Sequence, residues 1–191
     1  MASLPRHGIF CLEGLWDAKL TDRSSVLPTL DTLERLRVAT YIHRDVGTPA
    51  ELEMYLRKWR QKQYQDYEVL HPASHGSPGA IHLGRTSIGF DELAACIAGG
   101  AVGRVIYFGS CRVMADRKGV ESFQKSTKAK LVCGYRKEVD WVESGAFDLI
   151  LLSGLVEDAR IDGRVNRLRR KYPDLVRLLG FETYPRFNRS P

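Results

Sequence analysis

Short apolar segments rich in β-branched and aromatic residues alternate along this chain with segments whose apolar residues recur at helical spacing. The first pattern is typical of buried strands, and the second is typical of helices that pack against a sheet. Strands are predicted over residues 8–14, 38–43, 67–73, 104–108, 130–135 and 181–184, with one arm of a small hairpin at 79–84. Helices are predicted within residues 24–37, 48–59, 87–98, 119–128, 140–152 and 160–171. The alternation favours an α/β fold, namely a three-layer α/β/α sandwich with a mainly parallel sheet.

The length of 191 residues suits one domain with a sizeable hydrophobic core. The sequence contains no internal repeat, low-complexity segment or linker. We therefore expect a single domain over residues 1–191. Its core spans about residues 8–155, and a helical and strand extension follows over residues 156–191.

The charge of the chain is mildly basic, with 29 Lys and Arg against 23 Asp and Glu, which gives a net charge of +6. The basic residues cluster once, between Arg160 and Lys171. A helix with a solvated charged face explains this cluster better than a surface that binds phosphates. We therefore expect no nucleic-acid partner, and a nucleic-acid-associated role through this tract is the third of three hypotheses.

The four cysteines show neither a CxxC pattern nor the Cys/His spacing of a metal site. The sequence also lacks a secretory signal and any run of about 18 apolar residues that could cross a membrane. We therefore expect a cytoplasmic protein with reduced thiols, no membrane association, no metal and no cofactor.

Two of the predicted strands end in small-residue turns that carry reactive side chains. Ser74-His75-Gly76 follows the strand at 67–73, and Gly109-Ser110-Cys111 follows the strand at 104–108. A cysteine at a strand end usually serves packing, and His-Gly pairs are common in turns. If the two strands are parallel neighbours, however, both ends lie at the edge of the sheet where catalytic groups gather in α/β folds. The conjunction predicts that His75 and Cys111 face each other.

A histidine and a cysteine in this arrangement are suited to acyl transfer without a metal. A cysteine is nucleophilic as the thiolate, and a neutral imidazole can take the thiol proton and later hand it to a leaving amine. The backbone N–H groups of Gly76 and Cys111 are the candidates for an oxyanion hole. His75 and Cys111 are therefore the predicted catalytic residues.

The two motifs together resemble those of the caspase-like cysteine peptidases of clan CD. In that superfamily a histidine, usually within His-Gly, follows the third strand and the cysteine follows the fourth. The resemblance extends from Gly8 to about Leu155, and the stretch from Gly134 to Trp141 is similar to that of small bacterial CHAT-like proteins. It implies a caspase-like fold and a bacterial cysteine endopeptidase that acts on a peptide or protein substrate.

The sequence departs from the best-known members of that superfamily. His75 and Cys111 lie 36 positions apart (111 − 75), whereas the caspase pair lies about 50 residues apart. Gly109 and Ser110 also replace the acidic residue that precedes the cysteine in metacaspases and legumain.

The resemblance also places candidate substrate-binding residues. In the superfamily, the end of the first strand helps to line the pocket for the P1 side chain, which lies on the amino side of the cleaved bond. Glu13 and Asp17 match that place, and Tyr135 and Asp140 match the opposite wall. A carboxylate there favours Lys or Arg as the P1 residue. Ordinary loop acids explain Glu13 and Asp17 equally well, and Asp140 is also explained as a helix N-cap.

The leading hypothesis is a cysteine endopeptidase of bacterial stress or defence signalling. The alternative is a catalytically silent caspase-like scaffold that binds a protein partner. The sequence has no death-fold or repeat domain and no long acidic linker for self-cleavage. Control is therefore expected from a separate activating protein or from homodimerisation.

Overall fold

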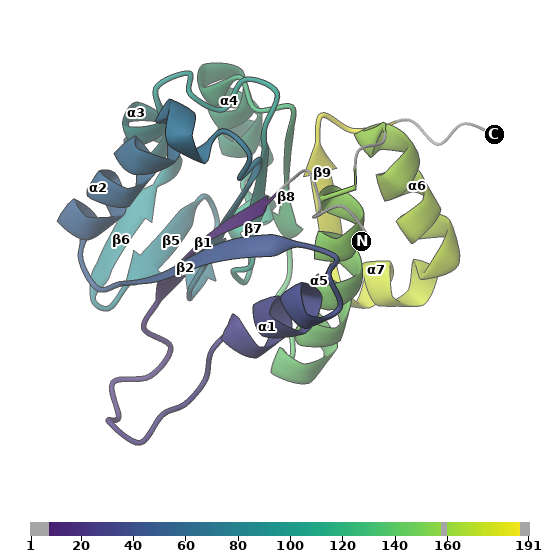
Figure 1. The fold of residues 1–191 in the computed structure, drawn as a ribbon, viewed down its shortest axis with the longest axis horizontal. Coiled ribbons are helices and arrows are strands. Elements are labelled where there is room, and N and C mark those ends of the chain that lie inside the picture. Colours follow the sequence, from purple (N-terminus) through teal and green to yellow (C-terminus); the bar gives the residue numbers. More distant parts are fainter. Residues whose placement is uncertain (1–7, 158–159, 188–191) are drawn as a thin grey trace.

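A six-stranded sheet forms the centre of the molecule in the computed structural model, which describes residues 8–157 and 160–187 (Figure 1). Its strands follow the order β2-β1-β3-β7-β8-β9. Neighbouring strands from β2 to β8 run parallel, and only the edge strand β9 is antiparallel to its neighbour. The strands are β1 (Gly8–Gly14), β2 (Thr40–Val46), β3 (Val69–Ala73), β7 (Val105–Phe108), β8 (Leu131–Tyr135) and β9 (Phe181–Tyr184).

Helices cover both faces of this sheet, so the predicted three-layer α/β/α sandwich with a mainly parallel sheet is confirmed. One face carries α1 (Leu27–Arg35), α5 (Trp141–Leu155), α6 (Ile161–Lys171) and α7 (Pro173–Leu179). The other face carries α2 (Pro49–Trp59), α3 (Phe90–Ile97) and α4 (Arg117–Thr127). Two short 3₁₀ helices, η1 (Lys62–Tyr64) and η2 (Val113–Ala115), complete the helical elements of the described chain.

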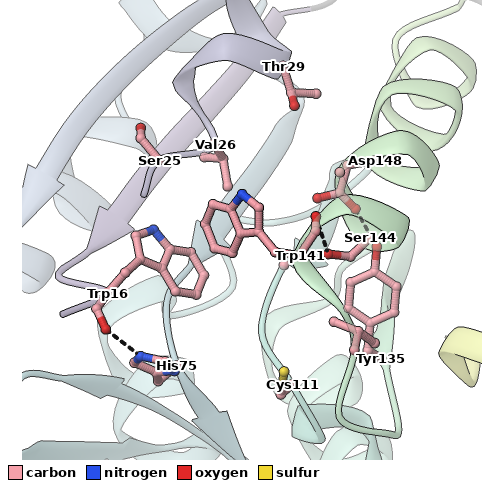
Figure 2. Close-up of a pocket in the computed structure, with 13 residues that line it drawn as sticks. Trp16, Ser25, Val26, Thr29, His75, Cys111, Tyr135, Trp141, Ser144 and Asp148 are labelled. Carbon is pink, nitrogen blue, oxygen red and sulfur yellow. Dashed lines mark hydrogen bonds between the residues drawn. The ribbon is translucent and has the colours of Figure 1, made fainter. Parts of the chain in front are cut away.

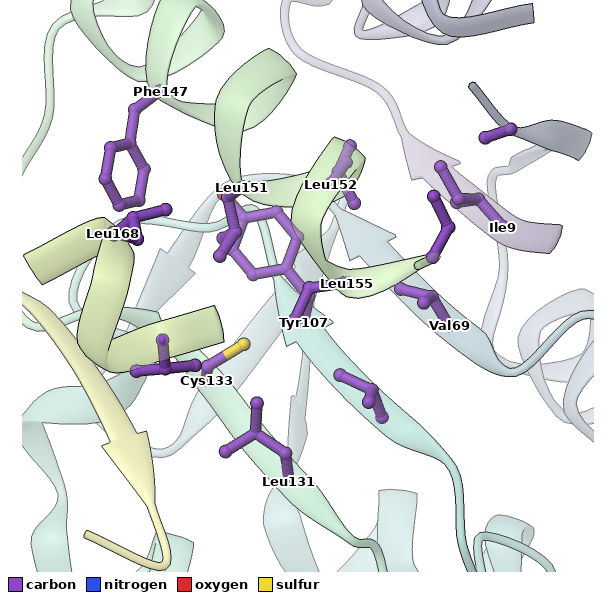
Figure 3. Packing of buried hydrophobic residues seen from close by; sticks show 14 of the residues in the cluster. Ile9, Val69, Tyr107, Leu131, Cys133, Phe147, Leu151, Leu152, Leu155 and Leu168 are labelled. Carbon is purple, nitrogen blue, oxygen red and sulfur yellow. The ribbon is translucent and has the colours of Figure 1, made fainter. Parts of the chain in front are cut away.

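The two layers arise because successive side chains of a strand point to opposite faces. In β1, Ile9 and Cys11 lie in the cluster under α1 and α5, whereas Phe10 and Leu12 lie in the cluster under α2 and α3. Figure 3 shows the first cluster, in which Tyr107 of β7 meets the leucines of α5. None of the helices that the structure describes is long and apolar enough to cross a membrane.

A second, smaller sheet follows directly after β3. It is antiparallel and consists of β4 (Gly76–Ser77), β5 (Ala80–Leu83) and β6 (Thr86–Gly89). The predicted hairpin arm at 79–84 corresponds to β5. The helix predicted from residue 87 begins only at Phe90, because Ile88 pairs with Ile81 across the small sheet. The Glu92 carboxylate then accepts a hydrogen bond from the Gly89 N–H at the start of α3.

The predicted helix start at Thr48 is confirmed by its capping bonds. The Thr48 hydroxyl accepts the Glu51 N–H, and the Glu51 carboxylate accepts the Thr48 N–H, as in a capping box. The strand predicted over 38–43 begins instead at Thr40 and continues to Val46. It begins later because the Val38 N–H still donates to the Leu33 carbonyl at the end of α1.

The C-terminal extension also forms largely as predicted. Its basic helix is α6, and its last strand is β9, which pairs with β8. Residues 158–159 and 188–191 of the extension, like residues 1–7 of the predicted domain, lie outside the described residues.

His71 is a buried histidine in β3, beneath the carboxyl edge of the sheet. Its ring stacks on Tyr107 with the ring centroids 4.8 Å apart, and its Nδ1 donates to the Tyr107 carbonyl. The second ring nitrogen, Nε2, has no hydrogen-bond partner among the described residues. Burial lowers the pKa of His71 from 6.5 to about 4, so the folded protein holds this ring neutral.

The low pKa of His71 predicts a loss of stability in acid. The unfolded chain binds a proton on this ring below about pH 6.5, whereas the folded chain does so only near pH 4. The free energy of unfolding should therefore fall by up to about 3 kcal/mol as the pH drops from 6.5 to 4 on account of this group. Urea unfolding of the wild type and His71→Leu over this range tests the prediction. The variant should have the shallower pH dependence, and equal slopes would contradict it.

Candidate active site

Hydrogen bonds between β3 and β7 continue past the last ladder pair into the turns that follow the two strands. The two strands are parallel neighbours, which is the condition on which the predicted pairing of His75 with Cys111 depends. Beyond their ladder, the Gly109 N–H donates to the Pro72 carbonyl (2.9 Å), and the Ser74 N–H donates to the Ser110 Oγ (3.2 Å). Because these bonds tie the two turns residue by residue, the chain brings the next residues of both turns, His75 and Cys111, to the same edge of the sheet.

Gly76 lies against the backbone of Cys111. A Cβ atom added at Gly76 would lie 2.7 Å from the Cys111 carbonyl oxygen and 2.7 Å from the Val113 Cγ2 atom. Both distances are too short for a real side chain, so only glycine permits this close approach. Packing therefore requires the glycine of the His-Gly pair, and the close approach places the two predicted oxyanion amides, those of Gly76 and Cys111, on adjoining segments.

His75 and Cys111 line the same pocket, whose volume is about 150 Å³. The His75 side chain is exposed and Cys111 is half-buried, so the pocket opens to solvent beside both groups. Figure 2 shows the Cys111 sulfur directed into the pocket, with the rings of Trp16 and Trp141 above it. These two indole rings meet edge to face, with their centroids 4.7 Å apart.

The hydrogen bond of His75 fixes its tautomer. The Nε2 atom lies 2.6 Å from the carbonyl oxygen of Trp16. A carbonyl only accepts hydrogen bonds, so Nε2 must carry the proton. In the neutral ring the unprotonated nitrogen is then Nδ1, which can act as a base. The Trp16 ring also packs against the imidazole in a T-shaped contact, with centroids 5.4 Å apart, and this contact restrains the ring orientation.

Trp16 is in turn held by Glu13, at the end of β1. The indole Nε1–H donates to the Glu13 carboxylate at 2.6 Å. The same carboxylate accepts bonds from three further groups, namely the Ser25 hydroxyl, the Val26 N–H and the His43 Nε2. Burial raises the pKa of Glu13, but these four donors outweigh burial and the pKa is lowered overall. Glu13 is therefore ionised, and it anchors both ends of the loop between β1 and α1.

The other predicted substrate-binding residues lie in different places. Tyr135 lines the pocket that contains Cys111. Glu13 and Asp17 line a different hollow of about 440 Å³, which shares only Trp16 and Ser25 with the lining of the first pocket. Asp140 is exposed at the start of α5, where its carboxylate caps the helix, and it does not line the pocket.

Asp148 of α5 lines the pocket, and the sequence analysis did not select it. Its side chain is only 6% exposed, and the hydroxyls of Tyr107 and Tyr135 both donate to its Oδ1 atom. Burial raises the pKa of Asp148 to about 6, even though the tyrosines favour the charged form. One signal was present in the sequence, because Asp148 is an acidic residue within the apolar run from Phe147 to Leu152.

Glu13, His43 and Asp45 form the one cluster of possible metal ligands among the described residues, with ligand atoms within 4.8 Å of one another. The Glu13 carboxylate is already occupied by its four donors, one of which is His43 at 2.6 Å. We therefore interpret this cluster as a hydrogen-bonded contact between Glu13 and His43 that holds β1 to β2.

The role of Glu13 as an anchor can be tested by removing its carboxylate. Glu13→Ala leaves Trp16, Val26 and His43 without a partner, so the free energy of unfolding should fall by roughly 2 to 4 kcal/mol. Glu53→Ala is the matched control, because Glu53 forms only an exposed ion pair with Arg57 on α2. The control should lose about 0.5 kcal/mol or less. Equal losses in urea unfolding of the two variants would contradict the anchor role.

No curated protein matches the chain. Residues 6–185 match a protein family described as a family of unknown function (DUF6642). The match includes every helix and strand described above, together with both His75 and Cys111. The chain is therefore a member of the DUF6642 family.

Proposed function

We propose that this protein is a cysteine endopeptidase in which Cys111 is the nucleophile and His75 is the general base. The observation that carries the proposal is the paired ends of β3 and β7. They bring an exposed imidazole and a half-buried thiol to the rim of one pocket. This placement also agrees with the caspase-like resemblance, since the histidine follows the third strand in chain order of the parallel sheet and the cysteine follows the fourth.

The proposed reaction uses the tautomer that Trp16 imposes. The Nδ1 atom of His75 takes the proton of the Cys111 thiol, and the thiolate sulfur attacks the scissile carbonyl carbon. The N–H groups of Gly76 and Cys111 stabilise the oxyanion that forms. His75 then returns the proton to the leaving amine as the C–N bond breaks. Water hydrolyses the remaining thioester by the same steps and releases the free enzyme.

The backbone immediately after Cys111 supports this assignment. Arg112 has a φ of 62°, in the left-handed region that non-glycine residues seldom adopt. Its N–H donates to the Lys137 carbonyl at 3.0 Å, a bond that ties the Cys111 loop to the segment before α5. Such strained residues cluster at functional sites, where the surrounding structure holds them. Beyond this turn, the next described residue along the chain that lines the pocket is Tyr135.

The proposal also includes the setting expected from the sequence. All four cysteines are free, which fits a reducing compartment such as the bacterial cytoplasm. We propose that the protein acts on peptides or proteins in bacterial stress or defence, under the control of an activating protein or of homodimerisation.

A catalytically silent scaffold is the alternative proposal, and one observation favours it. Large apolar side chains are exposed in the two segments that contribute Trp16 and Trp141 to the pocket: Leu15 and Leu20 in the loop after β1, and Trp141 and Val142 at the start of α5. Exposed apolar residues gathered at one place are typical of protein interaction sites. A protein substrate of an enzyme would use the same surface, so activity has to decide between the two proposals.

Alkylation of the native protein by iodoacetamide tests the dyad without knowledge of the substrate. Cys111 should react faster than Cys96, which is also half-buried but does not line the pocket of His75 and whose pKa is raised by burial. Cys11 and Cys133 should stay unmodified, because burial raises the pKa of both thiols. His75→Ala should slow labelling of Cys111 by about tenfold or more, since the thiolate is then no longer supported by a base. Mass spectrometry of the digested protein gives each rate.

The controls separate the two proposals. His82→Ala should leave every rate unchanged, because His82 bonds to Ser77 in the small sheet and does not line the pocket. Cys111→Ala should abolish cleavage of a mixed peptide library, and cleavage that survives in this variant would disprove the role of Cys111. If the wild type cleaves nothing and Cys111 reacts no faster than Cys96, the scaffold is the correct assignment.

A further inference from the structure

Asp148 is a buried carboxylate that faces the candidate active site without a cation. Its Oδ1 atom accepts the two tyrosine hydroxyls, whereas no described residue donates a hydrogen bond to Oδ2. No ion pair of the described chain includes Asp148. In Figure 2 the second carboxylate oxygen points away from Tyr135 toward the space beside Trp141. Buried carboxylates are normally paired with a positive charge, so this one is suited to receive a cation from outside the chain.

The rest of the pocket is also suited to a cation. None of the described residues that line it is a lysine or an arginine, and Asp148 is its one carboxylate. Trp16 and Trp141 form an aromatic wall, and indole faces attract guanidinium and ammonium groups. The volume of about 150 Å³ is that of a cavity known to hold one benzene-sized molecule. The pocket therefore has room for one side chain and not for a whole peptide.

The position of Cys111 on the same pocket indicates which substrate residue enters. The sulfur must reach the scissile carbonyl, and the side chain nearest that carbonyl belongs to the P1 residue. We infer that the pocket binds an arginine or lysine side chain at the P1 position, with Asp148 as the residue that forms the charge-assisted hydrogen bond. This inference rests on the proposed function. It assigns to Asp148 of α5 the role that the sequence analysis gave to Glu13 and Asp17.

Tyr107 and Tyr135 have a supporting role in this arrangement. Both hydroxyls donate to the same oxygen of Asp148, and the two hydroxyl oxygens lie 2.8 Å apart. The tyrosines therefore fix the carboxylate at the wall of the pocket and leave Oδ2 free for the substrate. A purely structural Asp148, serving only to accept these two bonds, would give stability without any selectivity for charge.

Peptides that differ only at the P1 position distinguish these roles. The set contains arginine, lysine, citrulline, norleucine and aspartate, of which citrulline is a neutral analogue of arginine with nearly the same shape. The measurement is kcat/KM for each peptide with the wild-type protein. Arginine should exceed citrulline by about 10- to 100-fold, the range of one charge-assisted hydrogen bond. Equal values for arginine and citrulline, or a preference for aspartate, would overturn the inference.

A variant then connects this preference to Asp148. Asp148→Asn should reduce the arginine-to-citrulline ratio to within about threefold of one, while cleavage of the citrulline peptide changes much less. Asp140→Asn is the matched control, because Asp140 caps the helix that contains Asp148 but lies outside the pocket, and it should keep the wild-type ratio. If a folded Asp148→Asn protein keeps the arginine-to-citrulline ratio of the wild type, the assignment to Asp148 is wrong. If this variant does not fold, the comparison of arginine with citrulline in the wild type still decides whether the pocket selects a positive charge.

The same experiment separates this inference from the function on which it rests. Cleavage of the norleucine or aspartate peptide without preference for a basic residue would disprove the selectivity and leave the endopeptidase intact. If the protein cleaves none of the peptides, and iodoacetamide modifies Cys111 no faster than Cys96, both the endopeptidase proposal and the selectivity are disproved.

Discussion

The pairing of β3 with β7 beyond the end of their ladder is the constraint on which the site depends. A parallel pair usually diverges where the loops begin, but here the bonds from Gly109 to Pro72 and from Ser74 to Ser110 keep the two turns together. The contact of Gly76 with Cys111 then allows no space for a side chain. Because the positions of His75 and Cys111 in the chain follow from a backbone bond and from a bond to the buried Ser110 hydroxyl, they do not rely on the packing of exposed side chains.

A second constraint comes from the first strand, on the other side of β3. The loop between β1 and α1 contributes Trp16, whose carbonyl selects the tautomer of His75. Loops of this length are usually free to move, but the Glu13 carboxylate accepts hydrogen bonds from both ends of this loop, at Trp16 and at Val26. The buried charge is tolerated because four donors surround it. The carboxylate thus controls the histidine through the backbone of Trp16 rather than through contact with it.

The sequence predicted the parts of this structure that depend on local patterns. The strands, the Thr48 and Asp140 caps and the two turns at His75 and Cys111 each have a signal within a few residues. Glu13 does not line the pocket because its buried carboxylate is already bonded to four donors from the loop after β1 and from β2. Asp148 could not be placed in the same way, because its partners come from β7 and β8 and its position depends on how α5 packs across them.

Glu13 and Asp148 show how the same chemical group serves two purposes in one fold. Glu13 has four donors, including a histidine, and its pKa is lowered despite burial. Asp148 has only two tyrosine hydroxyls, and its pKa rises to about 6 because burial outweighs them. A carboxylate whose oxygens are fully hydrogen-bonded within the chain stabilises the fold. One that faces a pocket with an unused oxygen is less stable as an anion unless a positive group is bound, and this difference supports the role that we propose for Asp148.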